Sequence, residues 1–138
     1  MKILFIEDHF IAANLAGYLE AHGLTVFSVS DLFQADILLE EKGPFDAAIV
    51  DLVLDIRDLP LELHAEAERQ YAGWIYYKHI LSKIPPLDKN TVICSAFTKI
   101  FREMLSENEK EKIFFIDKGD SDYHVQVLNA LRLIGGSA

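Results

Sequence analysis

The stretch Phe45-Asp46-Ala47-Ala48-Ile49-Val50-Asp51 (residues 45–51) decides the fold of this chain. It is a short, nearly continuous apolar run that follows Gly43-Pro44 and ends in an acid. Such a run predicts a strand buried on both faces of a parallel sheet. Three further runs have the same form: residues 3–6 before Glu7-Asp8, residues 91–94 before Ser95, and residues 113–117 before Lys118.

The residues that follow these strands predict a functional site. In an open parallel sheet, ligands bind in the crevice beyond the carboxyl ends of the strands. If the strands are neighbours, three carboxylates, a hydroxyl and an ammonium group meet at one edge of the sheet. That set suits a hard divalent cation and a phosphoryl group.

Helical patterns separate the strands, and the sequence as a whole predicts five β/α repeats. We expect helices over residues 9–22, 31–41, 73–83, 97–109 and 121–133, and a further strand over 24–29. Alternation of this kind predicts an α/β fold with a doubly wound, five-stranded parallel sheet in the order 2-1-3-4-5. One domain over residues 1–134 and a disordered tail over 135–138 complete the expected organisation.

Composition narrows the function. The 138 residues carry a formal net charge of −9, which argues against nucleic acid as a partner. No apolar stretch approaches the length of a membrane span, and no signal peptide is visible before the first strand. The single Cys94 lies within an apolar run, where we expect a buried, unreactive thiol. A reducing, cytoplasmic setting follows as the default.

In these features the chain resembles the receiver domain of two-component response regulators. The resemblance rests on Glu7-Asp8, Asp51, Ser95-Ala96 and Lys118, which stand in the family's order, each at a strand end. It covers the whole chain and implies the flavodoxin-like receiver fold.

The resemblance also implies a role for each site residue. Asp51 would be the phosphoacceptor, with the Lys118 ammonium and the Ser95 hydroxyl contacting the phosphoryl oxygens. Asp8 would bind Mg²⁺ directly, and Glu7 would act largely through a metal-bound water. Asp51 and the backbone carbonyl of Val53 would complete the protein ligands of the metal. Phe115 occupies the family's aromatic switch position, together with Ser95 at the switch hydroxyl.

The function implied is a stand-alone receiver rather than an enzyme with a separate substrate. It would take a phosphoryl group from a histidine kinase or phosphotransfer protein and signal by binding an unknown downstream protein. The alternative is a pseudo-receiver, a protein-binding module that is not phosphorylated. A third reading, a Mg²⁺-dependent phosphohydrolase resembling the haloacid dehalogenases, needs a second acid where this chain has Val53.

The chain departs from the family beside the expected site. The connection from Asp51 to Gly73 is longer than usual by roughly a dozen residues, which predicts an insertion at about 54–71. Asp55 and Gly119 stand where the family usually has prolines. Within the connection, His64 and Glu68 have the spacing of a metal pair, but a solvated acidic face is favoured.

The sequence also bears on how long a phosphoryl group would survive. By resemblance, Val53 and Phe97 flank the path of the water that would remove it. Neither side chain can orient a water by hydrogen bonding, so we expect slow loss of phosphate.

Overall fold

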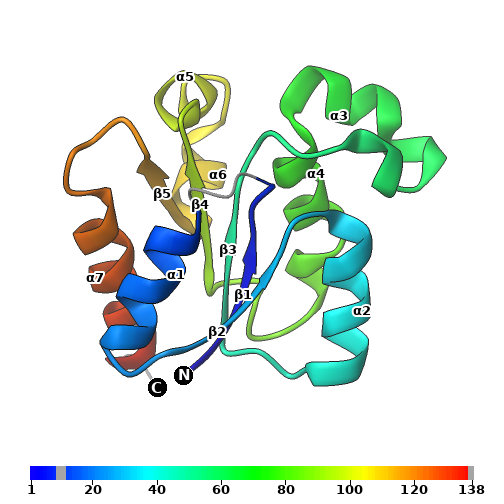
Figure 1. Cartoon of the computed structure of the whole chain (residues 1–138). Coiled ribbons are helices and arrows are strands. Elements are labelled where there is room, and N and C mark those ends of the chain that lie inside the picture. Colours follow the sequence, from blue (N-terminus) through cyan, green and yellow to red (C-terminus); the bar gives the residue numbers. More distant parts are fainter. Residues whose placement is uncertain (9–11, 137–138) are drawn as a thin grey trace.

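The structure is a computed structural model that describes residues 1–8 and 12–136, and its centre is a five-stranded parallel sheet. The strands are β1 (Lys2–Ile6), β2 (Thr25–Val29), β3 (Ala47–Val50), β4 (Thr91–Ser95) and β5 (Phe114–Asp117). They pair in the order β2-β1-β3-β4-β5, as Figure 1 shows, and this confirms the order predicted from the sequence.

Helices cover both faces of the sheet because its strands are apolar on both sides. In β1, Leu4 and Ile6 belong to one buried cluster, while Ile3 and Phe5 belong to the other. The first cluster is closed by α2 (Leu32–Lys42), α4 (Ala72–His79) and α5 (Thr98–Arg102), and the second by α1 (Ala12–Ala21) and α7 (Tyr123–Gly136). Alternate burial along each strand therefore produces a three-layer domain.

The strand register brings the carboxyl ends of the central strands to one edge. Ile6 pairs with Val50, and Ser95 pairs with Asp117. The backbone ladder continues past the strands, because Asp51 N donates to Ile6 O and Lys118 N donates to Ser95 O, both at 3.0 Å. The side chains that follow the strands thus begin from one rigid edge.

Local signals account for several helix boundaries. The Asp31 carboxylate accepts a hydrogen bond from Gln34 N at 2.7 Å and caps α2. Gly23 follows α1 with a φ of +88°, a conformation that favours glycine. The predicted start of the first helix at 9–11 lies outside the described residues. At the other end α7 continues over 135–136, which the sequence assigned to a tail, and 137–138 lie outside the described residues.

Two predicted helices were too long. The prediction over 97–109 was wrong because that stretch forms α5 and then a separate helix, α6 (Glu107–Lys112). Ser106 starts the second helix with a capping box, in which its hydroxyl accepts from Glu109 N and its own N–H donates to the Glu109 carboxylate. The helix predicted over 73–83 ends at His79, and a short 3₁₀ turn, η3 (Leu81–Lys83), follows it.

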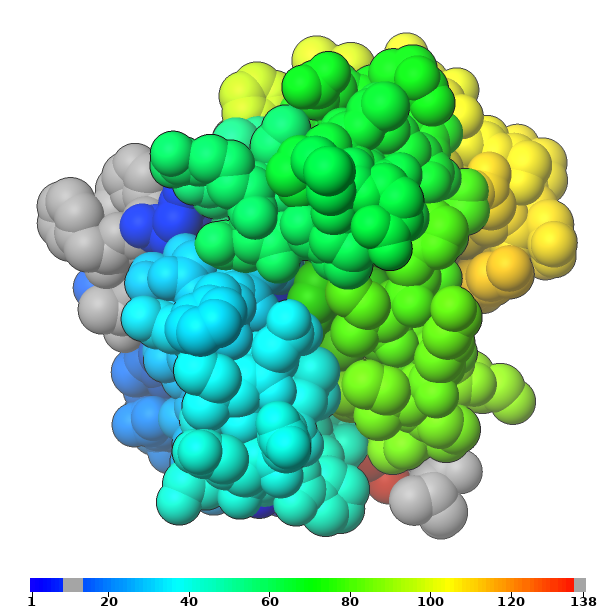
Figure 2. All heavy atoms as spheres, turned by 90° about the vertical axis from the view of Figure 1, so that its right-hand side faces the viewer, coloured from blue at the N-terminus to red at the C-terminus, as the bar shows by residue number. Residues whose placement is uncertain are grey.

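The connection between β3 and α4, which we call the connecting segment (residues 52–71), is folded against the domain. It contains the 3₁₀ turns η1 (Ile56–Asp58) and η2 (Leu61–Leu63) and the helix α3 (His64–Gln70). Leu54, Leu59 and Ala67 are buried in the same cluster as Leu32 of α2. Figure 2 shows this segment lying over one end of α2 and beside α4.

Candidate functional site

A cavity of about 420 Å³ lies at the carboxyl edge of the sheet, where β1, β3 and β4 end. The described residues that line it are Phe5, Glu7, Asp8, Leu15, Asp51, Val53, Ser95, Ala96, Phe97, Lys118 and Tyr123. Of the seven residues to which the resemblance gives a role in the site, six therefore lie around one space, and Phe115 does not line it.

Three carboxylates form the acidic side of this cavity. One oxygen each from Glu7, Asp8 and Asp51 lie within 4.8 Å of one another. Glu7 and Asp51 are buried, whereas Asp8 is exposed. Hard oxygen donors this close together suit Mg²⁺, which keeps several waters and needs few protein ligands. The residues present therefore fit the metal implied by the sequence.

Lys118 lies between two of these carboxylates. Its ammonium group forms a salt bridge with Glu7 and lies 3.6 Å from an Asp51 oxygen. Burial alone lowers the pKa of Lys118, but the hydrogen bond to Glu7 and the charge of Asp51 outweigh it and raise the pKa above its ordinary value. The lysine is therefore a fixed positive charge beside the predicted phosphoacceptor.

Glu7 carries the clearest electrostatic signature of the site. The pKa of Glu7 is raised from 4.5 to about 7: burial is the largest cause, and the neighbouring Asp51 carboxylate raises the pKa by more than Lys118 lowers it. The charged form of Glu7 is therefore disfavoured in this site when no cation is bound.

Ser95 lines the cavity and is held in place by its neighbours. Its hydroxyl oxygen accepts a hydrogen bond from Phe97 N at 3.3 Å, which leaves the hydroxyl hydrogen available to another acceptor. Thr98 fixes the Ser95 backbone, because its buried Oγ1 lies 3.1 Å from Ser95 N and 2.9 Å from Ile116 O. The sequence does not predict this role of Thr98, except through its position three residues after Ser95.

Gly73 explains how the backbone after Asp51 is positioned. Its N–H donates to Leu52 O at 3.0 Å, and a Cβ built on it would lie 1.8 Å from Asp51 O. Only a residue without a side chain allows α4 to approach the predicted phosphoacceptor this closely. The sequence shows a glycine at the start of a predicted helix, but it does not show that this glycine lies against the backbone of Asp51.

Phe115 is in an aromatic cluster and does not line the cavity. Its half-buried ring lies 6.1 Å from the Trp74 ring and 6.4 Å from the Phe101 ring, and the Arg102 guanidinium covers it at 5.8 Å. The ring thus packs between β5, α4 and α5. Its predicted role as a switch stays a prediction.

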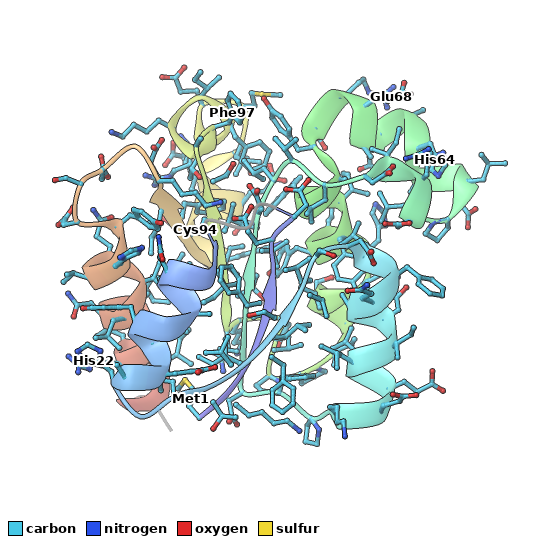
Figure 3. All side chains as sticks on the ribbon, in the orientation of Figure 1. Met1, His22, His64, Glu68, Cys94 and Phe97 are labelled. Carbon is cyan, nitrogen blue, oxygen red and sulfur yellow. The ribbon has the colours of Figure 1, made fainter. Side chains whose placement is uncertain are left out.

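Two apolar side chains, Val53 and Phe97, form the outer part of the cavity. They are 44% and 45% exposed. Phe97 lies on the connection between β4 and α5, at the carboxyl edge of the sheet (Figure 3). Its ring stacks on Tyr71 with 6.3 Å between centroids and an angle of 15°. Tyr71 and Tyr123 were not anticipated, since their proximity to the site comes from distant parts of the chain.

Cys94 lies beneath the site, in β4, and is 1% exposed (Figure 3). Burial raises the pKa of its thiol to about 12, so the thiolate that reacts is scarce. His64 and Glu68, by contrast, lie on α3 away from the cavity. The His64 ring is 2.9 Å from Leu59 O, so this histidine has a structural partner within the connecting segment.

The chain is similar to known proteins in its fold rather than in its sequence. No protein-family model and no curated protein matches the chain in sequence. Among solved structures, a sensor protein from Polaromonas is 23% identical, with a TM-score of 0.66 over 99% of this chain and 98% of that one. The receiver domain of a Francisella response regulator is 17% identical, with a TM-score of 0.67 over 99% of this chain and 97% of that one. A response regulator receiver protein from Sinorhizobium medicae is 16% identical, with a TM-score of 0.71 over 99% of this chain and 95% of that one.

These likenesses define the fold as that of response-regulator receiver domains. The recognition made from Glu7-Asp8, Asp51, Ser95 and Lys118 is confirmed at that level. That residues 54–71 are an insertion relative to other receivers stays a prediction. No helix among residues 1–8 and 12–136 is both long and apolar enough to cross a bilayer.

Proposed function

We propose that this chain is a response-regulator receiver that accepts a phosphoryl group on Asp51, with Mg²⁺, from a histidine kinase or phosphotransfer protein. It would not be an enzyme with a separate substrate, and it would signal by binding a downstream protein when phosphorylated. The observation that carries the proposal is the convergence of three carboxylates within 4.8 Å, with the Lys118 ammonium 3.6 Å from Asp51.

Phosphoryl transfer to Asp51 depends on positioning and charge neutralisation more than on acid–base catalysis. An Asp51 oxygen would attack phosphorus while the bond from phosphorus to the donor atom breaks, and that bond's electron pair would leave with the donor. Mg²⁺ held by Glu7, Asp8, Asp51 and the Val53 carbonyl would neutralise the charge of the phosphoryl group.

The chain's own residues supply the remaining interactions. The Lys118 ammonium is near enough to Asp51 to pair with an oxygen of a phosphoryl group attached there, as a point charge. The Ser95 hydroxyl has a free hydrogen to donate to a second oxygen, because its lone pair is the partner of Phe97 N. If the Ser95 hydroxyl gave up its hydrogen bond with Phe97 N, Ser95 could move toward Asp51. This movement would change the space around the Phe115 ring.

Phosphorylation of the purified chain tests the proposal directly. Incubation with acetyl phosphate and Mg²⁺ should add one phosphoryl group by intact mass, and hydroxylamine should remove it, as expected of an acyl phosphate. Asp51→Asn should abolish the addition, while Asp122→Asn, at an exposed acid before α7, should not.

An unchanged mass in the wild-type chain would refute phosphorylation. Phosphorylation that persists in Asp51→Asn would show that a different residue accepts the group. A chain that folds, takes up no phosphate and shows no saturable response to Mg²⁺ would instead be a pseudo-receiver, the alternative left open by the sequence.

A further inference from the structure

We propose that Asp117 holds the Lys118 ammonium in place beside Asp51 and is thus a positioning residue for the phosphoryl transfer. The inference rests on the proposed function, because it concerns how the lysine of that same site is held. Asp117 is the last residue of β5 and is 9% exposed, but it does not line the cavity. Its effect on the site therefore passes through its neighbours.

The carboxylate of Asp117 joins two segments of backbone. One oxygen accepts a hydrogen bond from Gly119 N at 2.6 Å, and the other accepts one from Lys99 N at 3.2 Å. Lys99 is in the first turn of α5, where backbone N–H groups have no partner within the helix, and Phe97 before this helix provides no side-chain cap. The buried carboxylate thus ties the loop after β5 to the start of α5.

The backbone is consequently fixed on both sides of Lys118. Before its Cα, Lys118 N donates to Ser95 O at 3.0 Å. After its Cα, the next peptide group is held by the hydrogen bond from Gly119 N to the Asp117 carboxylate. The long lysine side chain therefore leaves the backbone from a defined point, and from there its ammonium group reaches the two carboxylates described above.

Gly119 makes this arrangement possible. A proline, which the resemblance predicts at this position, would have no N–H to donate to Asp117. A side chain would also interfere, since a Cβ built on Gly119 would lie 2.8 Å from the Asp117 oxygen that accepts the hydrogen bond. The acid and the glycine thus act as a pair, and the hydrogen bond between them holds the loop after Lys118 where a proline ring would otherwise do so.

Lysine labelling tests the positioning without any phosphodonor. A pulse of acetic anhydride on the folded chain in buffer with a chelator, followed by peptide mapping, gives the acetylation of Lys118 relative to Lys78, which pairs with Glu66. Asp117→Ala should raise this ratio about threefold, because an ammonium group held less closely by carboxylates loses its proton and reacts more readily. Gly119→Ala, which displaces the same carboxylate, should raise it too. Asp117→Asn should keep the wild-type ratio, because its amide oxygen still accepts from Gly119 N.

Phosphorylation rates then show whether the effect passes through Lys118. With Mg²⁺ and acetyl phosphate, Asp117→Ala should slow phosphorylation about tenfold, as expected when a charge beside the reacting group is displaced. In the Lys118→Ala background the same substitution should have no further effect. Asp120→Ala is the matched control, because this acid is in the same loop but pairs with the Lys99 side chain, and it should change neither readout.

Two results would overturn the proposal. One is an equal labelling ratio in wild type and Asp117→Ala. The other is the same slowing by Asp117→Ala with and without Lys118, which would mean that the acid only supports the fold. If Asp117→Ala unfolds, which labelling of all lysines would reveal, Gly119→Ala carries the same two tests. If the wild-type chain takes up no phosphate, the proposed function fails, and the labelling ratio still decides whether Asp117 positions Lys118.

Discussion

Replacing Glu7 by glutamine should stabilise the cation-free protein above neutral pH. The pKa of Glu7 is raised from 4.5 to about 7, mainly by burial and then by Asp51. Between these values the folded chain binds a proton at Glu7 that the unfolded chain has released, so the free energy of unfolding falls as pH rises. Each pKa unit is worth about 1.4 kcal/mol, which makes the full loss about 3 kcal/mol at pH 8.

The assay is urea unfolding followed by the fluorescence of Trp74, the single, buried tryptophan, in buffer with a chelator. Wild type should lose stability from pH 4.5 to about 7, whereas Glu7→Gln should lack this component of the loss. At pH 8 we expect the variant to be more stable by about 1–3 kcal/mol, since the amide also gives up the ion pair with Lys118. Mg²⁺ should narrow the difference by stabilising wild type.

Glu107→Gln is the control, because that side chain is on the surface of α6 and pairs with Lys110. It should follow wild type at every pH. A difference in unfolding free energy between wild type and Glu7→Gln that stays constant from pH 5 to pH 8 would refute the reasoning, because it would mean that Glu7 titrates alike in both states.

Four further predictions concern the same edge of the sheet. Asp51→Asn should raise the melting temperature of the cation-free chain by about 2–4 °C, because it removes one crowded charge; a lower value would contradict the crowding. Gly73→Ala should cost about 2–3 kcal/mol in urea unfolding, since its Cβ would meet Asp51 O at 1.8 Å, while Gly17→Ala, with nothing within 4 Å, should not destabilise. In the phosphorylated chain, Val53→Asn should hasten phosphate release about tenfold by orienting a water, and an unchanged rate would remove that argument. Cys94 should react with iodoacetamide on the order of a hundredfold more slowly in the folded chain than in urea; equal rates would rule out its burial.

The sheet and its chemical edge could be predicted because their signals are local. Each strand is a short apolar run, and the alternation with helical patterns leaves few topologies. The residues that follow the runs, such as Asp51 and Lys118, therefore had to meet once the strand order was right. The boundaries within 97–109 failed because a capping box at Ser106 competed with a continuous helical pattern.

The connecting segment could not be derived from its sequence. Its acidic residues predicted a solvated surface, and Glu66 does lie near the surface. Yet Glu66 accepts from both Lys78 and His79 at 3.0 Å, and thereby ties α3 to α4. Burial of Leu59 and Ala67 depends on packing in one cluster with residues of α2, which lies in a different part of the sequence.

The sequence by itself determined the fold class, the strand order and the set of side chains at the carboxyl edge, because period and strand ends are properties of neighbouring residues. Only the tertiary structure decided the burial that raises the pKa of Glu7, the approach of Gly73 to Asp51 and the stacking of Tyr71 on Phe97. These depend on burial and on contacts between distant segments, which no local pattern contains.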